Sequence, residues 1–355
     1  MVFNYLVNAD RSGRAATVFS TIACSAVMLA LCGFSTANAS STTPAESSSK
    51  PLKVLMNVKI TGHTFFTEIA NGAKSVAKKE GMDLSYTGPT FSNGQQQATQ
   101  LKSLLKQGYN VLLLSANSPT VLAPPAKEAM SMGMPVITFD ADVIPSARDL
   151  FVSDISNAAF GKCLIDQAAK FGGPNVEVAY VSSNPDSPNQ IAWIDASEAY
   201  RKAHYPNMKV VTTVYGHGDE GESMQAAQSV VEAHPHVKVL LTPDSGAAPG
   251  AAEAITKAGL IGKVISIGQG DLASSRYYIK NGSEISCMWN NDGLGRLLMY
   301  LSKYAASHKL PTNGTFSGDP DGTWQIKDSV INYASTATVF TKDNVDQYTD
   351  AGAKK

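Results

Sequence analysis

Short apolar runs alternate with segments of helical periodicity along most of this chain. KVLMNVKI at 53–60 is followed by apolar residues at helical spacing up to Gly81, and VLLLS at 111–115 and VITF at 136–139 enclose a helical segment at 119–132. Strands that alternate with helices of this length form parallel sheets through β-α-β crossovers. The sequence therefore predicts an α/β fold with helices on both faces of parallel sheets.

A second series of the same kind follows the first. The segments 111–139 and 237–267 share one order of features: an apolar strand, a polar loop with Ser and Pro, an Ala-rich helix, a Gly and a second apolar strand. This repetition predicts two doubly wound parallel-sheet lobes. A single doubly wound domain is the alternative, because such domains repeat these units by nature. The strands expected in the second series are 177–182, 209–213, 237–241 and 264–267.

The first 39 residues have the pattern of a cleaved secretory signal peptide. Two arginines precede an uncharged, mostly apolar stretch at 15–34, and Ala37-Asn38-Ala39 supplies a small-residue cleavage site. We expect export with cleavage after Ala39 and then a flexible polar leader at 40–50. A membrane anchor and a lipoprotein cut before Cys32 are the alternatives.

Charge and cysteine content exclude several classes of protein. The 29 Lys and Arg against 30 Asp and Glu leave no overall basic field, so nucleic acid is not an expected partner. Four cysteines in 355 residues are too few for a disulfide scaffold, and cleavage of the signal would leave Cys163 and Cys287. These two could pair in an oxidising compartment, but their spacing says nothing about proximity, and we expect buried free thiols.

Motifs for catalysis are missing. The sequence has no GxxxxGK[ST] phosphate loop, no GxGxxG after the first strand, no CxxC, no HExxH and no GxSxG. We therefore expect no cofactor, no metal site and no enzymatic activity. The rival hypothesis is an exported enzyme that acts on a sugar through the carboxylates of Asp140 and Asp142.

Polar and aromatic side chains gather where the predicted parallel strands end, which is where open α/β sheets bind ligands. Aromatic faces suit the C–H surfaces of a sugar, while carboxylate, amide and ammonium groups satisfy its hydroxyls. Core packing of the aromatic residues and helix capping by Asp140 and Asp244 are the alternatives. The candidate ligand-binding residues at these ends are Lys59, Phe65, Phe66, Asp140, Asp142, Asn189, Gln190, Asp244, Ser245, Gln269, Trp289 and Asn290.

Three long runs resemble the periplasmic sugar-binding proteins of ABC importers of the ribose and galactose type. These runs are KITGHTFFTEIANGAKSVAKKEG at 59–81, QLKSLLKQGYNVLLLSANSPTVLAPPAKEAMSMGMPVITFDAD at 100–142 and LLTPDSGAAPGAAEAITKAG at 240–259. The branch that binds autoinducer-2 or rhamnose is similar in further segments. They are YTGPT at 86–90, Phe139-Asp140-Ala141-Asp142, Pro243-Asp244 and FTKDNVDQY at 340–348.

The resemblance implies a type I periplasmic binding protein, in which two lobes are joined by a three-strand hinge and close around a ligand. Crossovers near 153, 290 and 322 would divide the chain into an N-terminal lobe at 51–153 plus 291–322 and a C-terminal lobe at 154–290 plus 323–350. The expected protein is a periplasmic monomer that delivers a small uncharged sugar or polyol to an ABC permease. A chemoreceptor or sensor kinase is a further partner that the family allows.

The resemblance also implies ligand contacts. The contact positions of the autoinducer-2 binder are, in this chain, Lys59, Asp140, Gln190 and Pro243. Two positions depart from that binder, because Asn189 stands where it has an aspartate and Ser245 where it has a small apolar residue. The changed hydrogen-bonding groups favour a pentose, deoxyhexose or polyol over autoinducer-2. A signal receptor of the autoinducer-2 kind is the alternative.

Overall fold

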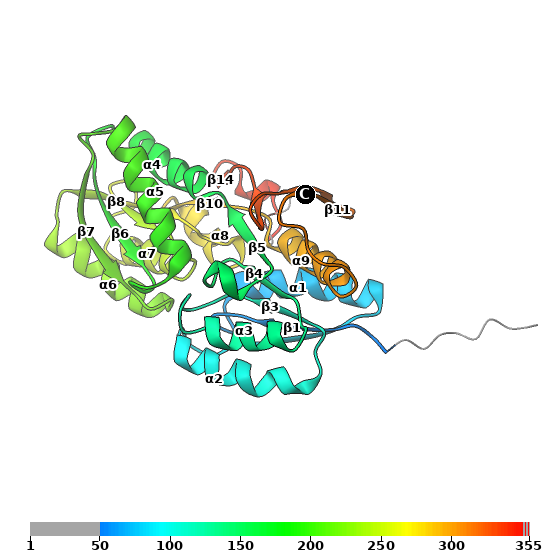
Figure 1. The fold of residues 1–355 in the computed structure, drawn as a ribbon. Coiled ribbons are helices and arrows are strands. Elements are labelled where there is room, and N and C mark those ends of the chain that lie inside the picture. Colours follow the sequence, from blue (N-terminus) through cyan, green and yellow to red (C-terminus); the bar gives the residue numbers. More distant parts are fainter. Residues whose placement is uncertain (1–49, 351, 353, 355) are drawn as a thin grey trace, which may run out of the picture. The chain divides into compact units, whose positions relative to one another are not determined.

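Two six-stranded sheets form the framework of the computed structural model, which describes residues 50–350, 352 and 354 (Figure 1). The predicted signal peptide at 1–39 lies outside the described residues, as does the expected leader at 40–50 except for its last residue. Within the described part, no helix is both long and apolar enough to cross a membrane. The prediction of two α/β lobes is confirmed.

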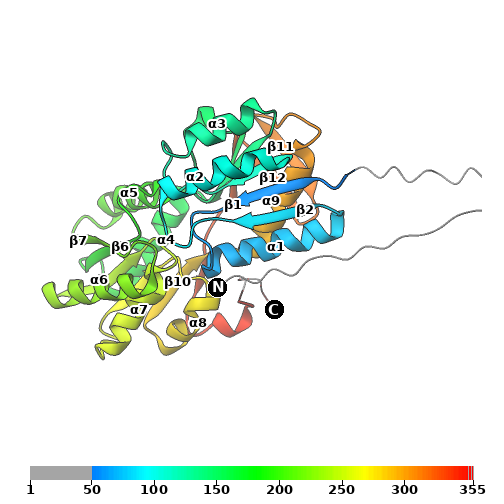
Figure 2. The same ribbon diagram turned by 90° about the horizontal axis from the view of Figure 1, so that it is seen from below.

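The first sheet has parallel strands in the order β13-β5-β4-β3-β1-β2. Helices α1 (Thr64–Glu80) and α9 (Asn291–Ala305) cover one face, and α2 (Gly94–Leu104) and α3 (Ala123–Ser131) cover the other (Figure 2). Both faces are covered, so the runs in β3 and β4 are buried at every position. The strands are β1 (Lys53–Asn57), β2 (Asp83–Thr87), β3 (Val111–Leu114), β4 (Val136–Phe139), β5 (Leu150–Ile155) and β13 (Val330–Ala334).

The second sheet repeats this architecture in the order β14-β10-β9-β8-β6-β7, with β14 antiparallel to β10. Helices α4 (Asn157–Gly172) and α5 (Pro188–His204) pack on one face, and α6 (Glu220–Ala233) and α7 (Ala247–Lys257) pack on the other. Helix α8 (Leu272–Asn281) connects β9 to β10. The strands are β6 (Glu177–Ser182), β7 (Lys209–Tyr215), β8 (Val237–Thr242), β9 (Ile265–Gly268), β10 (Glu284–Met288) and β14 (Thr338–Phe340).

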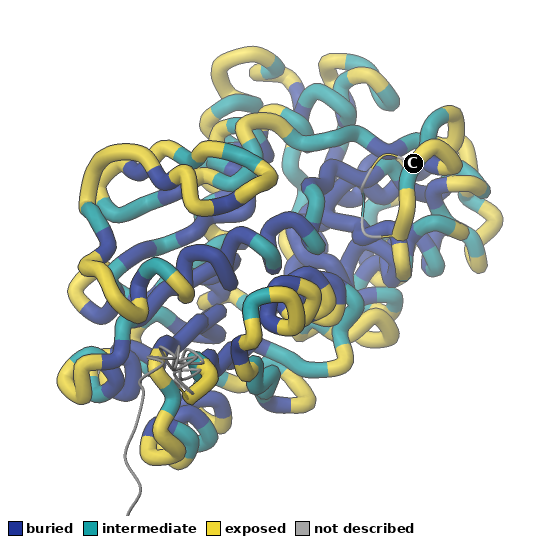
Figure 3. The backbone as a smooth tube through the Cα atoms, turned by 90° about the vertical axis from the view of Figure 1, so that its right-hand side faces the viewer, coloured by how far each residue is buried: buried dark blue, intermediate teal, exposed yellow. Residues whose placement is uncertain are grey.

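The buried residues follow these layers. In Figure 3 the dark blue, buried backbone runs through the inner elements, while exposed residues gather at the outer turns. Among the described residues, the remaining elements are three short 3-10 helices and one hairpin: η1 (Leu105–Gln107), η2 (Pro145–Ala147), η3 (Val345–Gln347), β11 (Gly314–Asp319) and β12 (Gly322–Ile326).

Three chain segments connect the lobes, and the third lies later than expected. The chain passes from β5 to α4 at 155–157, from β10 to α9 at 288–291, and from β13 to β14 at 334–338. The expected crossover near 322 is wrong, because β13 pairs in parallel with β5 and so belongs to the first lobe. The residues around 322 form the β11–β12 hairpin, and the chain crosses to the second lobe only after β13.

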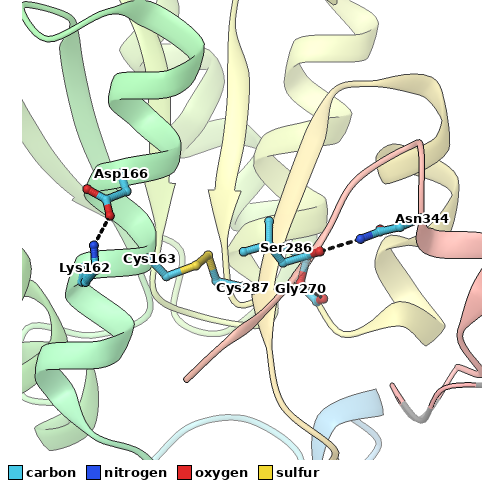
Figure 4. Close-up of a disulfide and its surroundings, with 8 residues drawn as sticks. Lys162, Cys163, Asp166, Gly270, Ser286, Cys287 and Asn344 are labelled. Carbon is cyan, nitrogen blue, oxygen red and sulfur yellow. Dashed lines mark hydrogen bonds and ion pairs between the residues drawn. A yellow bond between two sulfur atoms is a disulfide. The ribbon is translucent and has the colours of Figure 1, made fainter. Parts of the chain in front are cut away.

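Cys163 and Cys287 form a disulfide, which corrects the expectation of free thiols (Figure 4). Cys163 lies in α4 and Cys287 in β10, and their Cα atoms are 6.4 Å apart. Helix α4 packs against the second sheet, and this tertiary contact brings together residues separated by 124 positions. Both cysteines belong to the second lobe.

Candidate functional site

A cavity lies between the two lobes, and the space not filled by atoms, counted together with the solvent at its mouth, is about 390 Å³. Its walls come from loops and helix starts that follow the carboxyl ends of parallel strands in both sheets, as expected for an open α/β fold. The lining residues are Lys59, Ile60, His63, Phe65, Phe66, Ser92, Asp140, Ser183, Asn189, Gln190, Gly218, Asp244, Ser245 and Gln269.

The structure brings together most of the candidate residues and adds others. From the set predicted by sequence, the cavity wall contains Lys59, Phe65, Phe66, Asp140, Asn189, Gln190, Asp244, Ser245 and Gln269. Sequence reasoning missed Ile60, His63, Ser92, Ser183 and Gly218. A signal for Ser183 was present, since it directly follows the strand EVAYVS, and Ser92 and Gly218 also lie in loops after strand ends.

Asp142 is a candidate that the structure places outside this cavity wall. Its carboxylate accepts hydrogen bonds from Arg148 Nε at 3.0 and 2.9 Å and from Thr138 Oγ1 at 2.5 Å. Arg148 Nη1 also donates to the carbonyl oxygen of Ser329, at 2.8 Å. Asp142 thus anchors Arg148, which holds the residue preceding β13 against the first lobe.

Trp289, Asn290 and Pro243 also lie outside the wall. Trp289 is 4% exposed and packs edge-on against Phe65, with ring centroids 6.3 Å apart, and against Phe160. The side chain of Asn290 accepts a hydrogen bond from Gly293 N and caps α9. Pro243 is buried directly after β8. Core packing and helix capping therefore account for Trp289 and Asn290.

Polar bonds around Asp140 connect the lobes. Asn189 Nδ2, from the second lobe, donates to Asp140 Oδ1 at 2.6 Å. Lys59 Nζ, from the first lobe, donates to Ser187 Oγ at 3.1 Å and to Asn189 Oδ1 at 3.4 Å, and lies 3.9 Å from Asp140 Oδ2. These contacts require the lobes to be together, so the structure is of a closed cleft.

Asp140 itself has an uncommon backbone conformation and a buried carboxylate. Its φ of 58° lies in the left-handed region, which Asp tolerates better than most residues and which often marks functional sites. Burial raises the pKa of Asp140, while the charge of Lys59 and the hydrogen bond from Ser115 act in the opposite direction. A carboxylate held by a nearby ammonium group suits the recognition of ligand hydroxyls.

Gln190 and Asp244 form a connected pair on the second lobe. Gln190 Oε1 accepts from Ser182 Oγ and from the backbone N and Oγ of Ser183, at 2.6 to 2.9 Å. Its Nε2 donates to Asp244 Oδ2 at 2.9 Å, while Asp244 Oδ1 accepts from the backbone N of Gly246 and Ala247 at the start of α7. Asp244 therefore both accepts hydrogen bonds from the backbone at the start of α7 and forms part of the cavity wall.

Further contacts join the lobes beside the cavity. Thr64 Oγ1 donates to Asp271 Oδ2 at 2.8 Å, which connects the first turn of α1 to the cap of α8. At another edge of the cleft, Asn184 Nδ2 donates to Ser92 Oγ at 3.2 Å, and Asn184 Oδ1 lies 2.9 Å from His217 Nδ1. The lobes are therefore joined by polar contacts at points other than Asp140.

Glu68, in α1, is a buried carboxyl group close to this interface. Its Oε2 accepts a hydrogen bond from Asn291 Nδ2 at 2.9 Å. Burial, and secondly the charge of Asp271, raise the pKa of Glu68 to about 8. The carboxyl group of Glu68 therefore binds its proton more tightly in the folded protein than in the unfolded chain. The stability that it contributes is complete below about pH 4.5 and is lost as the pH rises through about 8.

We predict that Glu68→Gln flattens the alkaline loss of stability. Gln keeps the acceptor for Asn291 but has no charge to bury. Between about pH 5 and 9 the wild type should lose roughly 3 kcal/mol more unfolding free energy than the variant. Denaturant titrations at both pH values measure this difference, with the exposed Glu232→Gln as the control. Equal losses in wild type and Glu68→Gln would contradict the prediction.

The described residues contain no group of three or more His, Cys, Asp or Glu side chains arranged to hold a metal ion. The side chains of the cavity wall offer hydroxyl and amide groups, the ammonium group of Lys59, the imidazole of His63, carboxylates and aromatic faces.

Comparison with known proteins gives consistent matches. The profile of the family described as "Periplasmic binding protein domain" matches residues 54–310. The ribose import binding protein of Bacillus subtilis is 21% identical over 210 residues, covering 59% of this chain and 67% of that protein. The D-allose-binding periplasmic protein of Escherichia coli is 22% identical over 243 residues, covering 66% of this chain and 78% of that protein.

Solved structures with bound small molecules share the fold. LsrB from Clostridium saccharobutylicum in complex with AI-2 aligns with a TM-score of 0.79 at 25% identity, covering 84% of this chain and 99% of that chain. An ABC transporter solute binding protein from Clostridium phytofermentas with bound L-rhamnose aligns with a TM-score of 0.79 at 23% identity, covering 84% and 98%.

Proposed function

The chain belongs to the periplasmic binding protein family, and on that premise we propose that it is the solute-binding component of an ABC transporter. Its ligand is a small sugar, deoxysugar or polyol held between the two lobes. The observation that carries this proposal is the interlobe cavity, whose wall combines Phe65 and Phe66 with Lys59, Asp140 and polar groups of the second lobe. The names of similar proteins, which include ribose, allose and rhamnose binders, support the ligand class.

In this proposal, the side chains of the cavity wall make apolar and polar contacts with different parts of the sugar. Phe65 and Phe66 meet edge to face with ring centroids 5.0 Å apart, and together they offer an apolar surface to the C–H groups of a sugar. Lys59 and Asp140 offer a donor and an acceptor of opposite charge, which leaves the pair neutral toward an uncharged ligand. Asn189 and Gln269 add polar groups from the second lobe.

The three connections between lobes are the proposed hinge. Rotation at 155–157, 288–291 and 334–338 would separate Lys59 from Ser187, and Asp140 from Asn189, and open the cavity. The closed form would then be the state that an ABC permease recognises.

Members of this family work outside the cytoplasm, and we propose export through a signal peptide cleaved after Ala39. The Cys163–Cys287 disulfide supports export, because disulfides persist in oxidising compartments. We also propose that the protein has no catalytic activity. The enzyme hypothesis needed Asp140 and Asp142 to act as a pair, and the bonds of Asp142 with Arg148 remove that support.

A ligand screen tests the proposal. D-ribose, D-allose, L-rhamnose, D-arabinose, ribitol and autoinducer-2 are added separately to the purified mature protein, and thermal unfolding is followed. A ligand at about 100 times its dissociation constant should stabilise the fold by roughly 2.7 kcal/mol, which raises the melting temperature by several degrees. Recovery of the bound compound unchanged argues for binding and not turnover. A screen in which no sugar or polyol shifts the melting temperature would reject the proposal.

A further inference from the structure

Asp154 is a buried carboxyl group next to the ligand cavity that the proposed contacts do not use. It is the penultimate residue of β5, close to the first connection between the lobes, and is 1% exposed. Neither of its carboxyl oxygens receives a hydrogen bond from a donor group among the described residues. An ionised carboxylate in such a place would be costly, because burial without donors disfavours the charged form.

The neighbour that Asp154 can bond to is Asp140. Asp140 directly follows β4, which pairs in parallel with β5 so that Phe139 lies opposite Val152, and the backbone N of Asp140 donates to the carbonyl oxygen of Val152 at 3.3 Å. This pairing places the side chains of Asp140 and Asp154 next to each other, and each affects the pKa of the other. Asp140 already accepts from Asn189 Nδ2 and Ser115 Oγ, each at 2.6 Å. Two neighbouring carboxyl groups away from water cannot both be ionised, so one keeps its proton and donates a hydrogen bond to the other. Lys59, 3.9 Å from Asp140 Oδ2, favours the charge on Asp140.

We propose that Asp154 is a positioning residue, a neutral carboxylic acid that donates a hydrogen bond to Asp140 and holds its carboxylate in the orientation that a sugar hydroxyl meets. This inference rests on the proposed function. It assigns to Asp154 a role through Asp140, without a ligand contact of its own.

The hydrogen bond from Asp154 to Asp140 is most important when the cleft is open. Asn189 belongs to the second lobe, and its bond to Asp140 is lost on opening. Ser115 and Asp154 belong to the first lobe, as Asp140 does, so opening of the cleft would leave them beside it. Ser115 and Asp154 together hold the carboxylate of Asp140, whose backbone is left-handed, in one orientation before a ligand binds. This order reduces the entropy that is lost on binding.

The electrostatic surroundings agree with a neutral Asp154. Burial, then the charge of Asp140 and the hydrogen bond with it, raise the pKa of Asp154 well above its ordinary value, and Lys59 opposes them. The other charged or titratable groups around the pair are Asp244 on the second lobe, Tyr333 on β13, and the Arg148–Asp142 ion pair. Arg148 already bonds Asp142, which leaves Lys59 as the cation that faces Asp140.

The test compares Asp154→Asn and Asp154→Leu by calorimetric titration with the sugar that the screen identifies, from about pH 5 to 10. Asn keeps an N–H donor for Asp140, whereas Leu keeps only the volume. We expect Asp154→Asn to bind within about threefold of wild type at neutral pH, and Asp154→Leu to bind tenfold or more weakly. Toward alkaline pH the affinity of Asp154→Asn should fall less than that of the wild type, because only the wild type has a carboxyl proton at this position to lose.

A matched control is Glu284→Gln. Glu284 is also buried and has a pKa raised well above the ordinary value by burial, but it lies outside the cavity wall. Its variant should keep the wild-type pH profile of binding. Alkaline weakening that persists unchanged in Asp154→Asn, or binding lost equally in the Asn and Leu variants, would overturn the inference.

Carboxyl ¹³C NMR of the ligand-free protein separates this inference from the proposed function. A carboxyl resonance that remains protonated at neutral pH should be present in wild type and absent in Asp154→Asn. An Asp154 that is ionised at neutral pH would refute the positioning role even if sugars bind. If no sugar binds to wild type, the proposed function fails, and the NMR titration still decides the state of Asp154.

Discussion

Asp140→Asn should abolish sugar binding while the empty protein remains folded. Asn has nearly the same shape and tolerates the left-handed backbone of this position, so the change isolates the charge of the carboxylate. Without the negative charge of Asp140, Lys59 loses its ionic partner in the cavity, and the ligand loses a charged hydrogen-bond acceptor. Loss of a charged hydrogen bond together with an unpaired ammonium group should weaken binding about 100-fold or more. Asp140→Ala should lose binding in the same way.

Asp142→Asn is the matched control for this experiment. Asp142 is two residues away but is bonded to Arg148, and its substitution leaves that partly buried guanidinium without its carboxylate. We therefore expect the opposite result, with binding retained and the unfolding free energy lowered by roughly 2 to 3 kcal/mol. Isothermal titration and denaturant unfolding measure the two effects. Sugar binding retained in Asp140→Asn would remove Asp140 from the site.

Asp140 and Asp142 show which part of the site could be predicted from the sequence. Both follow VITF at the end of β4, and position at a strand end correctly brought Asp140 to the cavity. The orientation of the Asp142 side chain depends on Arg148, six residues further along the chain, which donates a hydrogen bond to it. A strand-end rule identifies the edge of a sheet where a ligand binds, but side-chain partners decide which residues face it.

Local sequence patterns predicted the strands of the sheets, but they did not predict features that depend on contacts between residues far apart in the chain. Continuous apolar runs predict strands buried on both faces, and the strand expected at 177–182 agrees with β6. The last crossover was predicted too early, because the local pattern did not show that the strand after the β11–β12 hairpin pairs in parallel with β5 and so belongs to the first lobe. Asp154 gave no signal, since a carboxyl within a strand is as easily an exposed edge residue.

The Cys163–Cys287 disulfide is the feature with the largest expected effect on stability. It closes a loop of 124 positions, for which the chain-entropy model gives roughly 5 kcal/mol, and native disulfides typically contribute about 2 to 5 kcal/mol. Cys163→Ala/Cys287→Ala should therefore melt about 10 °C lower than the oxidised wild type. Alanine is suitable because Cys287 is fully buried and a serine hydroxyl would lack a partner there.

Reduction provides the control for this variant. A reductant should lower the melting temperature of the wild type toward that of the double variant and leave the double variant unchanged. Neither cysteine lines the cavity and both belong to the second lobe, so the dissociation constant for the sugar should stay within about threefold of wild type. A double variant as stable as the oxidised wild type would show that the packing of α4 on β10, without the covalent bond, already determines the stability of this lobe.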